Sequence, residues 1–153
     1  MEHPKLVIVD DDHVILQAAK NVLNDICDVF TVTTAEGMFD VLAQNSPMLI
    51  LLDINMPGMN GFEILQRLKA DPATRAIPVV FLTGVQAPES EYEGLSLGAI
   101  DYILKPFSPQ LLFRRVELHI LIWKQRRLIK EQARMIEHLT KKQQDKPKVD
   151  EAE

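Results

Sequence analysis

Short apolar runs alternate along the chain with segments whose apolar residues have helical spacing. The apolar runs are LVIV (6–9), VFTV (29–32), MLILL (48–52), PVVFL (78–82) and DYIL (101–104). Helical spacing covers residues 14–25, 35–44, 61–70 and 88–98, and a fifth helix begins near Pro109. This pattern predicts five strands and five helices that alternate along the chain.

The first, third and fourth of these runs are apolar throughout, which is typical of parallel strands covered on both faces. Alternating strands and helices favour a parallel sheet with right-handed crossovers. Five such units in about 115 residues predict an α/β fold, a flavodoxin-like doubly wound (βα)5 domain with a five-stranded parallel sheet. The order of the strands does not follow from the pattern.

A different pattern follows Pro109. Apolar doublets recur every seven residues, at Leu121/Ile122, Leu128/Ile129 and Met135/Ile136. The isoleucines would occupy one seam position of a short coiled coil, and the other seam position holds Leu118, Gln125, Gln132 and Leu139. The alternative is a single long solvated helix whose doublets pack on the body. We therefore expect a domain at 1–122, a helical or coiled-coil extension at 123–141 and a disordered tail at 142–153.

The charge distribution supports this division into two units. Residues 1–113 hold 6 Lys/Arg and 15 Asp/Glu, a balance of −9, whereas residues 114–153 hold 11 and 7, a balance of +4. The two sums recover the net charge of −5. Because the basic residues of the second part alternate with acids and glutamines, we do not expect direct nucleic-acid binding.

The composition also bears on the cellular compartment. Hydrophobic residues make up 46% of the chain, yet no apolar run approaches the ~20 residues that a membrane span needs. The N-terminus lacks the features of a signal peptide, and the single cysteine, Cys27, excludes an internal disulfide. We therefore expect a cytoplasmic protein that does not contact a membrane.

Polar residues stand where the predicted strands end. Asp10, Asp11 and Asp12 follow the first strand, Asp53 follows the third, Thr83 the fourth and Lys105 the fifth. The carboxyl ends of parallel strands meet at one edge of the sheet, where ligands bind in open α/β folds. We therefore expect these side chains to converge, although each alone would more often be a helix cap, a turn former or a loop residue.

The converging residue types suit phosphoryl transfer. Several carboxylates at one edge raise one another's pKa values, and a hard divalent cation such as Mg²⁺ relieves that conflict. With the cation present, one carboxylate can act as a nucleophile towards phosphorus and form an aspartyl-phosphate. The metal, the Lys105 ammonium and the Thr83 hydroxyl could neutralise the phosphoryl oxygens. Asp12 is the expected cap of the first helix.

Four motifs, VIVDDD, LLDINMPGMNG, VVFLTG and GAIDYILKPF, occur in register with the predicted strand ends. In this order they resemble the CheY-like receiver domain of two-component response regulators, over roughly residues 4–122. The resemblance implies a signalling switch in which Asp53 accepts a phosphoryl group from a sensor histidine kinase or a phosphotransfer protein. It implies a Mg²⁺ site, in which Mn²⁺ can substitute, formed by Asp11, Asp53 and the backbone carbonyl of Asn55, with Asp10 acting through a water.

The resemblance also implies the remaining roles. Thr83 and Lys105 would contact the phosphoryl group, Thr83 and Tyr102 would form the switch, and the Lys105–Pro106 bond would be cis. The chain would catalyse its own phosphorylation and dephosphorylation without turning over a separate substrate. We expect a homodimer through the C-terminal helix, through the face formed by segments 88–98, 101–104 and the helix after Pro109, or through both.

Two alternative readings remain at this stage. The first is a haloacid-dehalogenase-type phosphatase, because Asp10–Val14 fits its DxDx(T/V) motif, with Asp10 as nucleophile and Asp12 as general acid. That reading leaves LLDINMPGMNG unexplained, and no strand after Lys105 could carry the acidic pair that those enzymes need. The second is a receiver fragment of a larger regulator whose output domain is missing.

Overall fold

The computed structural model describes residues 3–58, 60–84 and 96–147. Its strands are β1 (Lys5–Val9), β2 (Asp28–Val32), β3 (Leu49–Asp53), β4 (Val79–Thr83) and β5 (Asp101–Leu104). Its helices are α1 (His13–Leu23), α2 (Ala35–Gln44), α3 (Gly61–Ala70) and α5 (Pro109–Gln144). The helix predicted at 88–98 falls largely outside the described residues.

The five strands form one sheet in the order β2-β1-β3-β4-β5, and every pair is parallel. The predicted doubly wound parallel fold is therefore confirmed. The order places β3 at the centre, where all five of its residues are buried. The strand includes Asp53, one residue beyond the predicted end, because Asp53 still pairs with Leu82 of β4.

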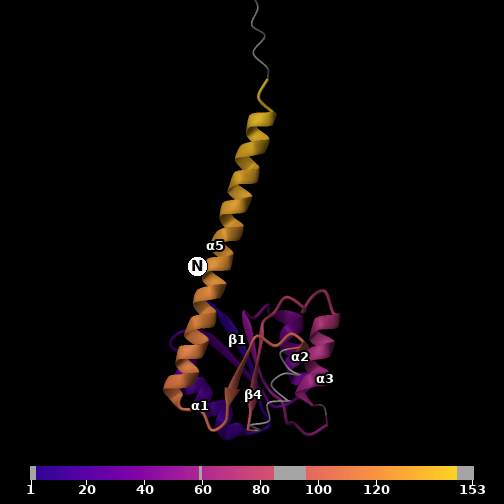
Figure 1. Cartoon of the computed structure of the whole chain (residues 1–153), viewed down its shortest axis with the longest axis vertical. Helices are drawn as coiled ribbons and strands as arrows, with labels where there is room; N and C mark the ends of the chain where they lie inside the picture. The colour runs from indigo at the N-terminus through magenta and orange to yellow at the C-terminus, as the bar shows by residue number, and fades with distance from the viewer. Residues whose placement is uncertain (1–2, 59, 85–95, 148–153) are drawn as a thin grey trace, which may run out of the picture. The chain divides into compact units, whose positions relative to one another are not determined.

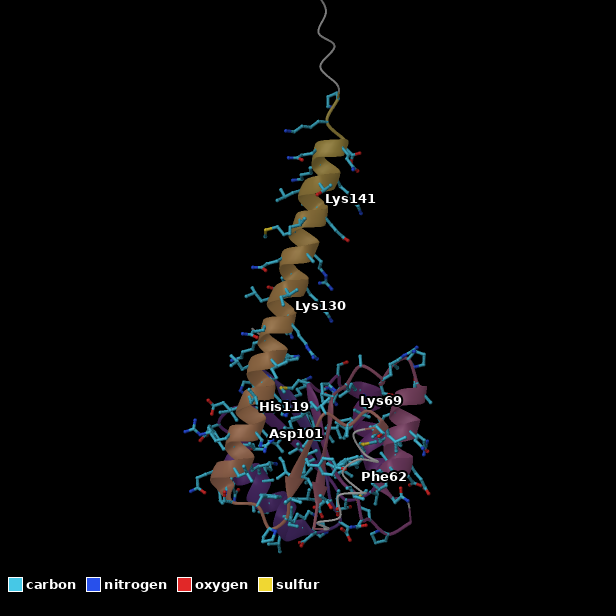
Figure 2. The ribbon with its side chains drawn as sticks, viewed as in Figure 1. Phe62, Lys69, Asp101, His119, Lys130 and Lys141 are labelled. Atoms are coloured by element: carbon cyan, nitrogen blue, oxygen red, sulfur yellow. The ribbon has the colours of Figure 1, made fainter. Side chains whose placement is uncertain are left out.

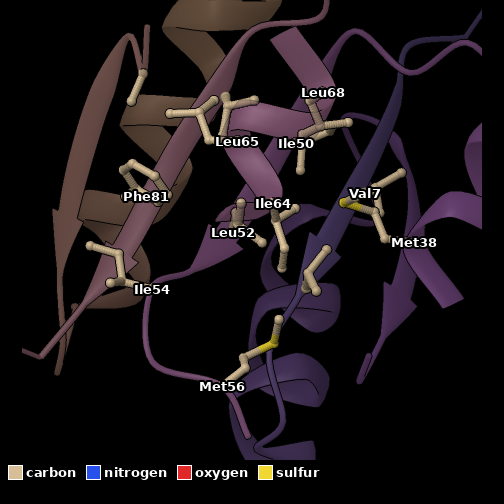
Figure 3. Packing of buried hydrophobic residues seen from close by; sticks show 13 residues of the cluster. Val7, Met38, Ile50, Leu52, Ile54, Met56, Ile64, Leu65, Leu68 and Phe81 are labelled. Carbon is tan, nitrogen blue, oxygen red and sulfur yellow. The ribbon is translucent and has the colours of Figure 1, made fainter. Parts of the chain in front are cut away.

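Helices cover both faces of the sheet (Figure 1). Because successive side chains of a strand point to opposite faces, alternate strand residues form two separate apolar layers. One layer joins strand residues such as Val7, Ile50, Leu52 and Phe81 to α2 and α3 (Figure 3). On α1 and the first turns of α5 the buried residues are Leu16, Ala19, Leu23, Leu112, Val116 and Ile120. These layers hold the strand ends in fixed positions.

Each of the first three helices begins at a polar cap. The side chains of Asp12, Thr34 and Asn60 accept the backbone N–H groups of Val14, Gly37 and Glu63, respectively. Such caps satisfy N–H groups that have no partner within the helix. The predicted cap at Asp12 is thus confirmed.

The chain divides into two compact units, Met1–Ile120 and Leu121–Glu153. In the second unit the helix continues to Gln144, three residues beyond the predicted end of the extension at 141. Its apolar doublets are exposed: Leu128, Ile129, Met135 and Ile136 are between 54% and 66% exposed. The end of the predicted tail, residues 148–153, lies outside the described part of the chain.

Candidate phosphoacceptor site

Three acidic side chains converge at the carboxyl edge of the sheet. Carboxylate oxygens of Asp10, Asp11 and Asp53 lie within 4.8 Å of one another. Asp10 follows β1 and Asp53 ends β3, and these two strands are paired in the sheet. Asp10 and Asp53 are buried, whereas Asp11 is exposed. The sequence-predicted convergence of these acids is therefore present in the folded chain.

Lys105, just after β5, completes this cluster. Its Nζ lies 2.5 Å from Oδ2 of Asp10 and 3.4 Å from Oδ2 of Asp53. The other oxygen of Asp10 accepts the backbone N–H of Asp12 at 2.9 Å. The ammonium thus lies between two buried carboxylates, where a low local dielectric strengthens its attraction to both. The ammonium also weakens the electrostatic repulsion between the carboxylates of Asp10 and Asp53.

The ionised form of the Asp53 carboxyl remains unfavourable despite the Lys105 ammonium. Burial raises its pKa above the ordinary value, and the neighbouring Asp10 charge raises it further. Lys105 and the backbone N–H of Asn55, which Oδ1 of Asp53 accepts at 3.1 Å, act in the opposite direction. Because the net direction is upward, one positive side chain does not fully compensate the buried acids.

This donor set fits a hard divalent cation. Carboxylate oxygens from Asp10, Asp11 and Asp53 are the ligand type that Mg²⁺ prefers, and they lie close enough to share one ion. Burial and, after it, the Asp10 charge raise the pKa of Asp53, and a bound cation would offset the repulsion between these two carboxylates. The exposed Asp11 leaves the cluster open to solvent, so a cation and its waters can enter.

The turn after β3 packs tightly against the backbone of Asp53. The Gly61 N–H donates to the carbonyl of Ile54 at 2.8 Å. A Cβ added at Gly61 would lie 2.8 Å from Cα of Ile54 and 2.9 Å from the carbonyl oxygen of Asp53. Only glycine therefore allows α3 to begin this close to the strand that carries Asp53. Sequence reasoning did not assign this role, although the Asn-Gly pair at 60–61 marks the position.

The two residues expected to form the switch lie on neighbouring strands. Thr83 ends β4, is buried, and accepts the backbone N–H of Lys105 through its carbonyl at 2.7 Å. Tyr102 of β5 is half-buried, with its ring centroid 5.9 Å from that of Phe81 on β4. The Lys105–Pro106 bond is cis, as predicted.

The local geometry disfavours the phosphatase reading of Asp10–Val14. The Asp12 carboxylate caps α1 by accepting the Val14 N–H at 2.9 Å, and it is not among the converging acids. Asp10 is buried and bound by Lys105. A general acid needs a carboxyl group beside the reacting atoms, so Asp12 is poorly placed for that role.

Comparison with known proteins then identifies the family. The family described as response regulator receiver domain matches residues 6–117. This chain belongs to the receiver domain family. The match covers the four motifs and, apart from Lys5 at the start of β1, all five strands, so the receiver domain and the sheet are the same part of the chain. The phosphatase alternative is therefore wrong.

Receiver domains of longer proteins are among the relatives. Response regulator PleD of Caulobacter vibrioides is 35% identical over 113 residues, 73% of this chain and 25% of PleD. A probable cyclic di-GMP phosphodiesterase of Vibrio cholerae is 49% identical over 81 residues, 53% of this chain and 18% of that protein. The regulatory protein VanR of Enterococcus faecium is 36% identical, with 84% of this chain and 54% of VanR covered. The chain thus spans between about a fifth and about half of the length of these relatives.

Solved structures agree with the receiver fold. The chemotaxis response regulator CheY4 of Vibrio cholerae superposes with a TM-score of 0.72 at 28% identity, covering 77% of this chain and 99% of CheY4. The BeF3-activated DrrB receiver domain has a TM-score of 0.68 at 32% identity, covering 78% of this chain. No helix in the described ranges has the length and apolar character to cross a membrane.

Proposed function

We propose that Asp53 is the phosphoacceptor of this receiver domain and that the chain is a phosphorylation-dependent switch. The supporting observation is the convergence of Asp10, Asp11 and Asp53 with the Lys105 ammonium at one edge of the sheet. Asp53 is the member that ends the central strand, so its carboxylate stands between the ends of β1 and β4. The donor of the phosphoryl group is a phosphohistidine of a sensor kinase or of a phosphotransfer protein.

Each neighbouring side chain has a distinct task in this proposal. Asp11, Asp53 and the backbone carbonyl of Asn55 would hold Mg²⁺, for which Mn²⁺ could substitute, and Asp10 would contribute through a water. When bound, the cation supplies positive charge to the phosphoryl oxygens. The Asp53 oxygen attacks phosphorus, the bond from phosphorus to the histidine nitrogen breaks, and Lys105 and Thr83 bind the transferred group.

The phosphorylated state would reach the surface through Thr83 and Tyr102. If the Thr83 hydroxyl moves towards the phosphoryl group, it leaves space into which the Tyr102 ring can turn. The contact of Tyr102 with Phe81 places that ring against the strand that carries Thr83, which supports this coupling. Such a change is a two-state rearrangement whose equilibrium the phosphoryl group biases.

Association of two chains is the proposed readout. The exposed doublets of the second unit recur every seven residues, the spacing of a coiled-coil seam, which supports a parallel homodimer through this helix. Gln125 and Gln132 in the seam would keep the pairing weak enough for phosphorylation to bias it. The face predicted for segment 88–98 together with β5 and α5 is a second candidate surface, and most of that segment lies outside the described residues.

The receiver does not turn over a separate substrate in this proposal, and the switch operates in the cytoplasm. Because the chain spans only part of its relatives, it is also proposed to control an output domain in a longer regulator. Relatives named PleD and a probable cyclic di-GMP phosphodiesterase are examples of proteins in which a matching segment forms a minor part of the length.

Modification with acetyl phosphate and Mg²⁺ tests the phosphoacceptor assignment. Peptide mapping of the wild-type chain should place the label on Asp53, and Asp53→Asn should abolish it. Asp12→Asn is a matched control, because it alters a carboxylate that only caps α1. Labelling on Asp10, or undiminished labelling of Asp53→Asn, would refute the assignment. Profiling phosphotransfer from candidate kinases would then identify the partner.

A further inference from the structure

A second ionic cluster links β5 to α5 within the first unit, at the N-terminal end of β5, whereas the acidic site lies at the carboxyl end of that strand. We define the β5–α5 joint as Asp101, Arg115 and His119. Nη1 of Arg115 donates to both carboxylate oxygens of Asp101, at 2.9 and 2.8 Å. Nε2 of His119 lies 3.5 Å from Oδ2 of the same carboxylate. Figure 2 shows Asp101 and His119 at the junction of strand and helix.

His119 is the unusual member of this joint. Its Nε2 is buried and has no hydrogen-bond partner among the described residues. Buried polar atoms are nearly always bonded, so an unsatisfied one requires a physical explanation. A hydrogen bond to Asp101 needs an N–O distance of about 2.7–3.2 Å, only a few tenths of an ångström below the present 3.5 Å. A small movement of α5 against β5 would form it.

Asp101 has the capacity to accept that bond. Its Oδ1 already accepts the Tyr102 N–H at 2.8 Å and one donation from Arg115. Among the described residues, Arg115 donates to its Oδ2 and His119 lies at a longer distance from it. A carboxylate oxygen can accept two hydrogen bonds, so Oδ2 can take His119 without releasing Arg115. Shortening the distance from His119 to Oδ2 would therefore give the joint a second arrangement, in which His119 is bonded.

The joint also connects directly to the proposed switch. The Asp101 carboxylate accepts the backbone N–H of Tyr102. A movement of the β5 backbone at Tyr102 would therefore also move this carboxylate, to which Arg115 of α5 is bonded. Arg115 and His119 are four residues apart and share one face of the helix. The apolar packing of Leu112, Val116 and Ile120 is not directional, so it tolerates a small shift of the helix. The lengths of the bonds to Asp101, in contrast, change with such a shift.

We infer that the β5–α5 joint transmits the state of the phosphoacceptor site to α5, by closing the contact between His119 and Asp101 in one state and opening it in the other. This inference rests on the proposed function of Asp53 and names the residues that carry its signal. His119 acts as a positioning residue, because it touches neither the acidic cluster nor the phosphoryl group. Allosteric coupling of this kind typically changes an equilibrium about 5- to 150-fold.

The single tryptophan provides a native reporter. Trp123 lies on α5, four residues after His119. Beryllofluoride with Mg²⁺ is titrated into the whole chain while Trp123 emission is recorded, and the wild type should show a saturable change. His119→Phe keeps an aromatic ring but cannot donate, and should retain less than about one fifth of that change. His119→Gln retains an N–H donor and should restore most of it.

Two controls separate transmission from folding and from phosphorylation. His138→Phe makes the same chemical change at an exposed position of α5 and should leave the emission change intact. Mapping of the acetyl-phosphate label should still find Asp53 modified in all three variants. If the wild type is not labelled at Asp53, the proposed function is wrong. As a further control, Asp53→Asn should abolish the change in Trp123 emission.

The remaining outcomes overturn the inference while leaving the phosphoacceptor in place. One is a wild type that is labelled at Asp53 yet shows no change in Trp123 emission. Another is His119→Phe with a full emission change, or His119→Gln as impaired as His119→Phe. If His119→Phe proves too unstable to assay, Arg115→Gln is the second variant. Arg115 is exposed enough to tolerate the change, and the same loss of emission change is expected.

Discussion

Substituting Gly61 by alanine tests whether the close packing of α3 positions Asp53. The added Cβ would lie 2.8 Å from Cα of Ile54 and 2.9 Å from the carbonyl oxygen of Asp53, while ordinary contact begins at 3.4 Å. The two groups must therefore separate by about 3.4 − 2.8 = 0.6 Å. Both neighbours are backbone atoms, which cannot rotate away, so the strand end that carries Asp53 must move.

The size of the effect follows from this overlap. Overpacking typically costs about 1–3 kcal/mol, and the better helix propensity of alanine offsets at most about 1 kcal/mol. We expect Gly61→Ala to reduce the free energy of unfolding by about 1–2 kcal/mol, which lowers the melting temperature by roughly 4–10 °C. Displacing Asp53 by a fraction of an ångström should slow modification by acetyl phosphate about tenfold.

Gly84→Ala is the matched control for stability. Gly84 follows β4, and no atom of the described structure lies within 4 Å of the Cβ that the substitution would add. Urea unfolding of both variants, with label incorporation at Asp53, measures the two effects. Equal stability of Gly61→Ala and Gly84→Ala would refute the packing argument. Normal phosphorylation of a destabilised Gly61→Ala would show that α3 does not position Asp53.

Three further predictions concern pH, reactivity and capping. The raised pKa of Asp53 means that its ionisation destabilises the folded state as pH rises through the ordinary aspartate pKa of about 4. Without metal, the stability advantage of Asp53→Asn should therefore be larger at pH 7 than at pH 4, and an equal difference in urea unfolding at the two pH values would contradict this. Burial and the neighbouring Asp28 raise the pKa of the Cys27 thiol to about 11. Iodoacetamide at pH 8 should therefore label this thiol only as fast as the domain unfolds, and rapid labelling that urea does not accelerate would contradict this. Thr34→Ala removes the acceptor of the Gly37 N–H and should cost about 1 kcal/mol in urea unfolding, with Thr33→Ala as control; equal losses would contradict a capping role.

Much of the site could be anticipated because its residues lie at strand ends. The carboxyl ends of parallel strands share one edge, so the convergence of Asp10, Asp53 and Lys105 followed from the alternation of strands and helices alone. The Asp12 cap was also anticipated from local sequence, and the cis Lys105–Pro106 bond was anticipated from the resemblance to receiver domains. The convergence depends on the periodic spacing of apolar residues along the chain, and the cap depends on a contact between residues that are close in the sequence.

Other features depend on distances that no pattern along the chain contains. The sequence did not indicate that Lys105 would lie closer to Asp10 than to Asp53, because that depends on how β5 sits beyond β4. The link from Asp101 to Arg115 and His119 joins residues 14 and 18 positions apart, and only Asp101 belongs to one of the four motifs. Such contacts form when a helix packs across a sheet, so the packing angle determines which residues meet.

The sequence by itself determined the parallel sheet, the edge at which its chemistry gathers and the heptad spacing of the C-terminal helix, since each is a property of periodicity or of strand direction. The tertiary structure alone decided the order β2-β1-β3-β4-β5, the close approach of Gly61 to the Asp53 carbonyl and the unsatisfied nitrogen of His119. Those three depend on which surfaces pack together and how closely, because side chains far apart in the chain meet only once the helices are in place against the sheet.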